Sequence, residues 1–276
     1  MRGDGTPKGP SRAAHHAATI TSDMITQPFP GPRLKIRRAN KHISDLYDMF
    51  VAFSNSNFYA MSVEENLEKR THSLRLDIDT SGLHFEECAP IIGDVLHNLR
   101  SALDHLYFQV VLACDGKTTK WTKFPFEDSR EGLRAKVEEA LKQQRISREV
   151  ANFLVDTIKP YQCGNSTLWG LHELNIVDKH ESLIPVLKLM GFFGVHLEDE
   201  NHVRVGRSDY IADESCLINL TGTYGRKITL KDKGRPSANI VFNIGASVFA
   251  GETVVPTLKR ISEEVTRTVE AIEGSL

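Results

Sequence analysis

The sequence has few cysteines, no long apolar run and no excess of charge of either sign. Its 276 residues include 4 cysteines, which lie far apart without a C-x-x-C pair, so a zinc knuckle and a disulfide framework are excluded and buried, reduced thiols are predicted. No apolar run approaches the roughly 20 residues that span a bilayer, and the N-terminal segment lacks the apolar centre of a signal peptide. We therefore expect a cytoplasmic protein with no membrane segment. The formal net charge of -2 gives no overall attraction to nucleic acid.

Several catalytic signatures are also absent. The sequence contains no G-x-x-x-x-G-K-[ST], no G-x-G-x-x-G between a strand and a helix, no H-E-x-x-H and no G-x-S-x-G, which disfavours common nucleotide-binding, zinc-protease and hydrolase classes. A metal site is the next candidate, because His97 and His105, and His172 and His180, form two pairs with the same spacing. Over eight residues a helix rotates about 80° beyond two full turns, so the rings of each pair diverge. We predict no metal and no cofactor.

Hydrophobic periodicity predicts a single domain over residues 33–276, preceded by a tail at 1–32 whose Gly, Pro, Ser and Thr content is typical of disorder. Residues 33–181 are expected to be mainly helical, with a β-hairpin at 57–80 where apolar residues alternate. Short alternating runs in residues 182–250 predict an antiparallel sheet, and helical spacing in residues 253–273 predicts a closing helix. The predicted fold class is α+β, a helical bundle with an antiparallel β-sheet and a C-terminal helix.

Residues 91–112 form the most informative stretch, because a helix there would have one apolar face and one face unusually rich in titratable groups. The apolar stripe consists of Ile92, Val95, Leu96, Leu99, Leu103, Leu106 and Val110. The other side collects Asp94, His97, Arg100, Ser101, Asp104 and His105. We take this polar face as the candidate functional site.

A second helix is predicted over residues 166–180, with Asn165 or Ser166 as its N-cap. His172, Asn175 and Lys179 share its polar face, and Asp178 and His180 lie near its end. Both helices carry more polar groups than a lone buried face tolerates, because buried polar groups need partners. We therefore expect the two helices to pack against each other and to supply one another with hydrogen-bond partners.

Two motifs resemble a widespread set of uncharacterised bacterial and phage proteins. They are Gly93-Asp94-Val95-Leu96-His97-Asn98-Leu99-Arg100-Ser101-Ala102-Leu103-Asp104-His105 and Leu174-Asn175-Ile176-Val177-Asp178-Lys179-His180. The match covers most of residues 33–273, although Glu181 stands where an arginine is common. Since that family has no established activity, the resemblance implies fold and origin only.

The segment Arg100-Ser101-Ala102-Leu103-Asp104-His105 is similar to the R-x4-6-H motif of HEPN-type ribonucleases. Those enzymes are helical bundles that often pair, so that two motif helices face each other. The resemblance implies a homodimer that cleaves RNA without metal in a phage-defence or toxin context. His105 would act as general acid or base and Arg100 would stabilise the phosphate, with Asp104 and His97 as further candidate catalytic residues.

The alternative is a non-catalytic scaffold or binding protein in which the same residues form a structural network. Arg100 and Asp104 are spaced i,i+4, and Asp94 and His97 i,i+3, as ion pairs on helices commonly are. In this interpretation the network or ligand-binding residues are Asp94, Ser101, Asn175, Asp178, Lys179 and His180. Exposure distinguishes the two hypotheses, because a catalytic pair must open to solvent whereas a structural network is closed on itself.

Overall fold

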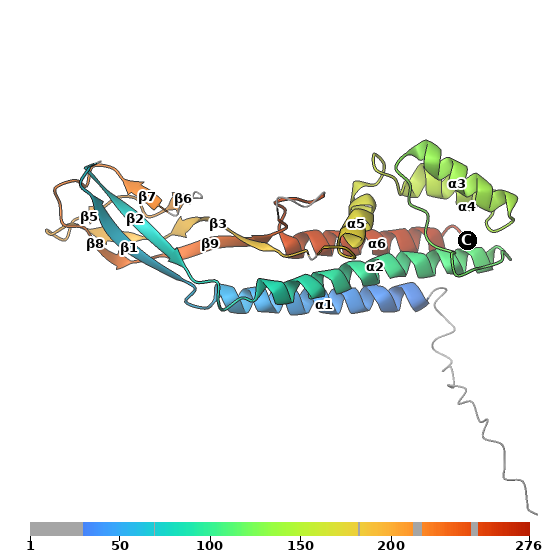
Figure 1. Ribbon diagram of the computed structural model, residues 1–276, viewed down its shortest axis with the longest axis horizontal. Helices are drawn as coiled ribbons and strands as arrows, with labels where there is room; N and C mark the ends of the chain where they lie inside the picture. The colour runs from blue at the N-terminus through green and yellow to red at the C-terminus, as the bar shows by residue number, and fades with distance from the viewer. Residues whose placement is uncertain (1–29, 69, 182, 212–216, 244–247) are drawn as a thin grey trace, which may run out of the picture.

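The computed structural model describes residues 30–68, 70–181, 183–211, 217–243 and 248–276. The long helices of this part are α1 (Pro30–Ser54), α2 (Phe85–Ala113) and α6 (Val254–Glu273). They pack side by side along the long axis of the molecule (Figure 1). Together with the strands they confirm the predicted α+β class.

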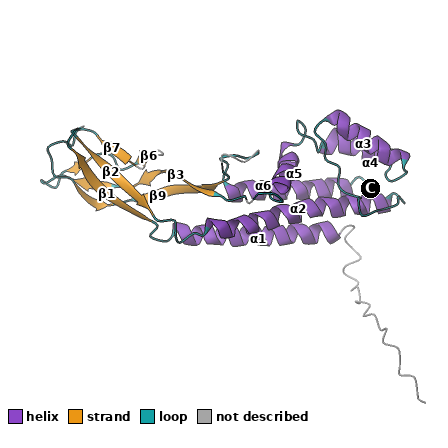
Figure 2. Cartoon of the chain, viewed as in Figure 1, coloured by secondary structure: helices purple, strands orange, loops and turns teal. Residues whose placement is uncertain are grey.

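The shorter helices lie within residues 33–181, which were expected to be mainly helical. They are α3 (Arg130–Lys142), α4 (Arg148–Phe153), the π-helical turn η2 (Leu154–Ile158) and α5 (Ser166–Val177). The helices α3 and α4 lie at the end of the molecule away from the strands, and α5 lies across α2 and α6 (Figure 1). Helix therefore fills most of the molecule's length, and the strands occupy the opposite end (Figure 2).

The described strands form three small antiparallel sheets, with the orders β1-β2-β7, β6-β3-β9 and β5-β4-β8. Their bounds are β1 (Tyr59–Asn66), β2 (Thr71–Ile78), β3 (Val186–Phe193), β4 (His196–Glu198), β5 (Arg204–Val205), β6 (Tyr210–Ile211), β7 (Leu217–Leu220), β8 (Thr229–Asp232) and β9 (Arg235–Val241). The predicted hairpin at residues 57–80 is β1 and β2, which pair from Tyr59 with Ile78 to Asn66 with Thr71. Antiparallel pairing was predicted, whereas the division into three sheets was not.

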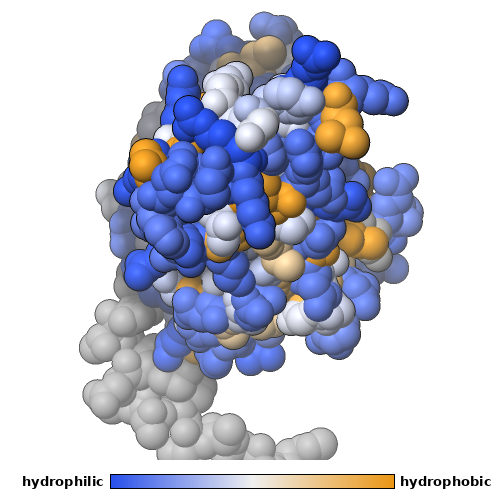
Figure 3. Space-filling model, turned by 90° about the vertical axis from the view of Figure 1, so that its left-hand side faces the viewer, coloured by the Kyte–Doolittle hydropathy of each residue, from blue (hydrophilic) through white to orange (hydrophobic). Residues whose placement is uncertain are grey.

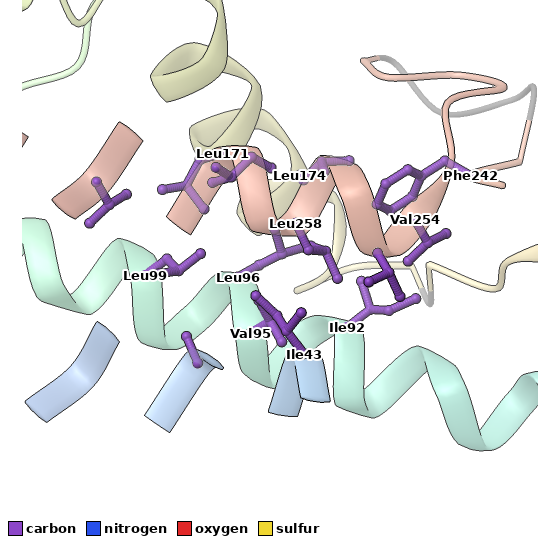
Figure 4. Packing of buried hydrophobic residues seen from close by; sticks show 14 of the residues in the cluster. Ile43, Ile92, Val95, Leu96, Leu99, Leu171, Leu174, Phe242, Val254 and Leu258 are labelled. Carbon is purple, nitrogen blue, oxygen red and sulfur yellow. The ribbon is translucent and has the colours of Figure 1, made fainter. Parts of the chain in front are cut away.

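The core runs along the helices, and the apolar stripes predicted from helical spacing are buried in all three long helices. Side chains from α1, α2, α5 and α6 meet in one cluster, which includes Ile43, Leu96, Leu174 and Leu258 (Figure 4). Full burial of each such aliphatic side chain contributes about 1.5 to 3 kcal/mol. The apolar face of α2 is thereby fixed toward α1 and α6, which leaves its polar face to α5 and to solvent.

Two boundaries differ from the sequence-based expectations. The helix α1 begins at Pro30, before the expected start of order at residue 33, while residues 1–29 of the predicted tail lie outside the described residues. The helix α2 begins at Phe85 instead of residue 91 and contains Pro90, whose missing N–H removes one helical hydrogen bond.

The prediction of buried cysteines is wrong for one residue of the described part. Cys88 is buried, Cys114 is half-buried and Cys163 is exposed, and all three thiols are free. Burial raises the pKa of the Cys88 thiol to about 11. Cys216 lies outside the described residues. Cys163 escapes burial because it lies in the turn between η2 and α5 instead of on a packed face.

The surface offers two general observations. Among the described helices, none has an apolar stretch long enough to cross a bilayer. The end of the molecule that carries the strands is mainly hydrophilic, and its hydrophobic areas are small and separate (Figure 3). A large apolar interface is therefore not evident on that end of the molecule.

Candidate functional site

The two motif helices are in contact, as predicted from their polar residues. Helix α5 packs against both α2 and α6, and it begins at the predicted N-cap, where the Asn165 side chain accepts a hydrogen bond from the backbone N–H of Leu168 at 3.1 Å. Helix α5 ends at Val177, and Asp178 is its C-cap residue. On α2, Gly93 faces the end of α5, and Arg100 and Asp104 face the segment before α3.

Arg100 and Asp104 form an ion pair that also binds the backbone of a distant segment. Nη1 of Arg100 donates to Oδ1 of Asp104. Nη2 of Arg100 donates to the carbonyl oxygen of Phe124 at 3.2 Å, and Oδ1 of Asp104 accepts from the N–H of the same residue at 2.9 Å. The exposed fractions of the two side chains are 11% and 28%. The pair thus satisfies both backbone groups of Phe124 and fixes this segment on α2.

An aromatic stack continues from Arg100 toward α5. The guanidinium carbon of Arg100 lies 4.7 Å from the ring centroid of Phe126. The ring of His172 stacks on that of Phe126, with centroids 4.5 Å apart and planes at 5°, and the ring of Trp169 lies 5.5 Å from His172. Cation–π and ring contacts of this kind hold the segment through its side chains as well as its backbone.

His172 is neutral in this environment. Burial, together with the positive charges of Arg100, Lys136 and Lys179, lowers the pKa of His172 to about 4. Its Nδ1 atom is buried and has no hydrogen-bond partner in the described part of the chain. A neutral imidazole stacked between aromatic rings and near a guanidinium avoids charge repulsion, so His172 serves packing in this arrangement.

A direct contact between the two motifs joins Gly93 on α2 to Asp178 at the end of α5. A Cβ atom on Gly93 would lie 2.6 Å from both carboxylate oxygens of Asp178, which is closer than any real contact of that kind. The carboxylate therefore occupies the space that the missing side chain leaves. Burial raises the pKa of Asp178, the nearby carboxylate of Asp94 raises it further, and His97 and Lys179 oppose the rise.

The remaining polar residues of α2 are more exposed. The Oγ atom of Ser101 lies 3.4 Å from Nε2 of His97, and Oδ2 of Asp94 lies 4.0 Å from Nε2 of His42 on α1. The Asp94 side chain has an exposed fraction of 64%, so its charge is well solvated. These residues form the open edge of the polar face.

His105 does not join Arg100. The two residues are five positions apart, which places them about 140° apart around α2. The position of a Cβ atom on Gly31 lies 3.0 Å from Nδ1 of His105, so His105 lies against the start of α1, whereas Arg100 faces Phe124. Within one chain the predicted catalytic pair is therefore divided between two sides of the helix.

The expectation that the two motif helices satisfy each other's polar groups is corrected in detail. Among the described residues, no ion pair or hydrogen bond joins Arg100 or Asp104 to Asn175 or Asp178; the partners are the backbone groups of Phe124 instead. Asn175 is buried, while Lys179 and His180 are exposed in the turn after α5. The two helices pack against each other as predicted. Their close contact is made by Gly93 and by apolar residues, however, and not by direct salt bridges.

The geometry limits the chemistry of the site. Among the described residues, no group of three or more His, Cys, Asp or Glu side chains is arranged to hold a metal ion. The strongest cation of the face, Arg100, is occupied by Asp104 and Phe124. His97 and His105 are exposed.

Sequence reasoning did not identify Phe126, and it named His172 and Gly93 without the roles that they have in the structure. Phe126 and His172 make the stack on Arg100, and Gly93 seats Asp178. The aromatic pair in Phe124-Pro125-Phe126 was visible only as an extended segment, and its partner on α2 lies more than twenty residues away. A glycine inside an apolar helical pattern is the one local signal that a neighbour approaches closely at that point.

Comparison of the chain with known protein families, with curated proteins and with solved structures finds no match. Function must therefore be argued from the geometry of the chain itself. The two resemblances stay predictions.

Proposed function

We propose that this protein is a non-catalytic scaffold or binding protein, in which the polar motif of α2 is a structural brace. The observation that carries this proposal is the occupation of Arg100 by Asp104, by the carbonyl of Phe124 and by the ring of Phe126. A phosphate could reach the guanidinium only if these contacts were broken, which would uncover the backbone groups of Phe124.

The brace has two contact points on α2. Arg100 and Asp104 hold the segment before α3, and Gly93 holds Asp178 at the end of α5. Phe124 lies 20 residues beyond Asp104 in the connection from α2 to α3, and Asp178 is the C-cap residue of α5. Such a brace orders the peripheral helices on the long bundle, which suits a protein whose work is to present surfaces.

The experiment compares the wild type with Arg100→Ala and with Arg130→Ala. Removal of Arg100 leaves a partly buried Asp104 without its cation and uncovers the Phe124 carbonyl, so we expect a loss of about 2 to 4 kcal/mol in the free energy of unfolding. Arg130 forms an exposed pair with Asp156, and its removal should cost less than about 1 kcal/mol. Urea denaturation followed by circular dichroism measures both values.

The alternative function is the metal-independent ribonuclease that the R-x4-6-H resemblance implies. Exposure of His97 and His105 favours it, because both imidazoles are open to a substrate or to a second copy of the chain. Purified protein is incubated with single-stranded RNA in the presence of a chelator. The scaffold proposal predicts intact RNA. Cleavage that is lost in both Arg100→Ala and His105→Ala, with wild-type stability in each, would establish the ribonuclease and end the scaffold proposal.

A further inference from the structure

The segment that the brace holds carries an exposed aromatic ring among free positive charges. It connects α2 to α3 and lies at the end of the molecule away from the strands (Figure 1). Between Asp115 and Glu127 it contains three lysines, Lys117, Lys120 and Lys123, and no acidic residue. We name residues 117–123 the Trp121 loop.

Trp121 is the most exposed aromatic side chain in the described part of the chain, with an exposed fraction of 72%. Two of the residues that follow it, Thr122 and Phe124, are buried, with exposed fractions of 9% and 2%. The ammonium nitrogen of Lys120 lies 5.1 Å from the centroid of the indole ring. One face of the Trp121 ring is thus exposed to solvent beside a positive charge. An exposed indole forgoes the stabilisation that burial of its apolar surface would give to the fold.

The loop has a defined backbone. The N–H of Thr119 donates to Oγ1 of Thr122 at 2.9 Å, and the N–H of Trp121 donates to Oγ1 of Thr119 at 3.1 Å. Immediately after the loop, Arg100 and Asp104 bind Phe124. The ring is therefore displayed on a fixed turn, and a partner that stacks on it loses little conformational entropy in the loop.

The positive charges of the loop are free. Lys117, Lys120 and Lys123 are all exposed, and within the ranges that the structure describes none of them forms an ion pair with a carboxylate, whereas Glu127, which follows the loop, is already paired with Lys136. Free lysines and a free aromatic face together are the two elements that bind single strands, through phosphates and stacked bases respectively.

We propose that the Trp121 loop is a docking site for single-stranded nucleic acid. One base stacks on Trp121, and the flanking phosphates contact the three lysines. The site reads no base edges, so it accepts RNA and DNA of varied sequence. An anionic membrane is the less favoured partner, because the ring is surrounded by threonine and lysine and not by further apolar side chains that would enter a bilayer.

This inference rests on the proposed function in one respect, because the brace of α2 positions the Trp121 loop. The docking site and the brace are tested by separate measurements. Binding is measured by fluorescence anisotropy with labelled uridine and thymidine oligonucleotides of about 12 nucleotides, the DNA strand being immune to ribonuclease cleavage. We expect a Kd of about 1 to 100 µM. Trp121→Ala should weaken binding by about 5- to 150-fold, the range found for loss of one base stack.

The charge contribution is tested by salt. Three phosphate contacts on a single strand give a slope of about -2 for log K against log salt, and the triple variant Lys117→Ala, Lys120→Ala, Lys123→Ala should abolish it. Matched controls are Phe193→Ala, an exposed aromatic side chain with an exposed fraction of 56% among the strands, and the double variant Arg37→Ala, Arg38→Ala in the basic start of α1. Both controls should bind like the wild type and all variants should melt like it.

Tryptophan fluorescence gives an independent readout, because the chain has 2 tryptophans and the second, Trp169, is buried with an exposed fraction of 9%. Bound oligonucleotide should quench the wild type and leave Trp121→Phe unchanged. The inference is overturned by absence of binding to either strand, by binding that survives Trp121→Ala, or by binding to phosphatidylserine vesicles in place of the oligonucleotides. None of these results depends on whether Arg100→Ala destabilises the protein.

Discussion

The contact between Gly93 and Asp178 makes a prediction whose sign depends on a residue in another helix. An alanine is favoured over glycine inside a helix by about 1 kcal/mol, and Gly93 lies inside α2. In this protein, however, the new Cβ would lie 2.6 Å from both carboxylate oxygens of Asp178 and 2.8 Å from its Cγ. The side chain of Asp178 is short and belongs to the C-cap of α5, so it cannot swing away without moving the end of that helix.

The magnitude follows from these two opposing effects. Overpacking of a well-filled site costs about 1 to 3 kcal/mol, and the upper part of this range applies because two oxygens and a carbon must all move. Gly93→Ala should therefore destabilise the protein by about 1 to 2 kcal/mol after its helical gain is subtracted. In an Asp178→Ala background the space is empty, and the same substitution should stabilise the protein by up to about 1 kcal/mol.

A double-mutant cycle measured by urea denaturation at neutral pH tests the argument, with an expected coupling energy of about 2 to 3 kcal/mol. Gly170→Ala is the matched control: its Cβ would lie 2.2 Å from Cζ of Phe249, a clash that Asp178→Ala cannot relieve. Its effect should be the same in both backgrounds. If Gly93→Ala stabilises the wild type as much as it stabilises Asp178→Ala, the carboxylate does not rest on Gly93 and the reasoning fails.

Three further predictions concern titration and exposure. The folded state lowers the pKa of His172 from 6.5 to about 4. The free energy of unfolding should therefore decline as pH falls between these two values, by roughly 1 to 2 kcal/mol after allowance for partial solvent screening. Denaturation of His172→Phe at a series of pH values should lack this decline. The folded state raises the pKa of Asp178 above 3.8, so the stability that the protonated carboxyl provides is complete below that value and is lost as pH rises through the raised pKa. The variant Asp178→Asn should keep this stability and melt above the wild type at neutral pH. A lower melting temperature of the variant would contradict this. Native protein treated with N-ethylmaleimide should react at Cys163 well before Cys88, whose buried thiol has a pKa of about 11, as peptide mass spectrometry can show; equal rates would contradict the placement of these thiols.

The elements of the fold were determined by local sequence. Apolar residues at steps of three and four predicted the buried stripe of α2, from Ile92 to Val110, and the same spacing identified α6. The alternation from Tyr59 to Ile78 predicted the first hairpin. These patterns are readable because a side chain's direction is fixed by the helical or extended backbone of its own segment, independently of the rest of the chain.

The sequence also located the polar face of α2 and its contact with α5, but only the tertiary structure decided which groups meet there. Arg100 and His105 share a motif, yet the helix turns them to different sides, toward Phe124 and toward Gly31. The contact of the Asp178 carboxylate with Gly93 brings together two residues that no local sequence pattern connects. The physical reason is that a hydrogen bond or a steric seat depends on positions in space to within a fraction of an ångström, and these are set by how the long helices pack.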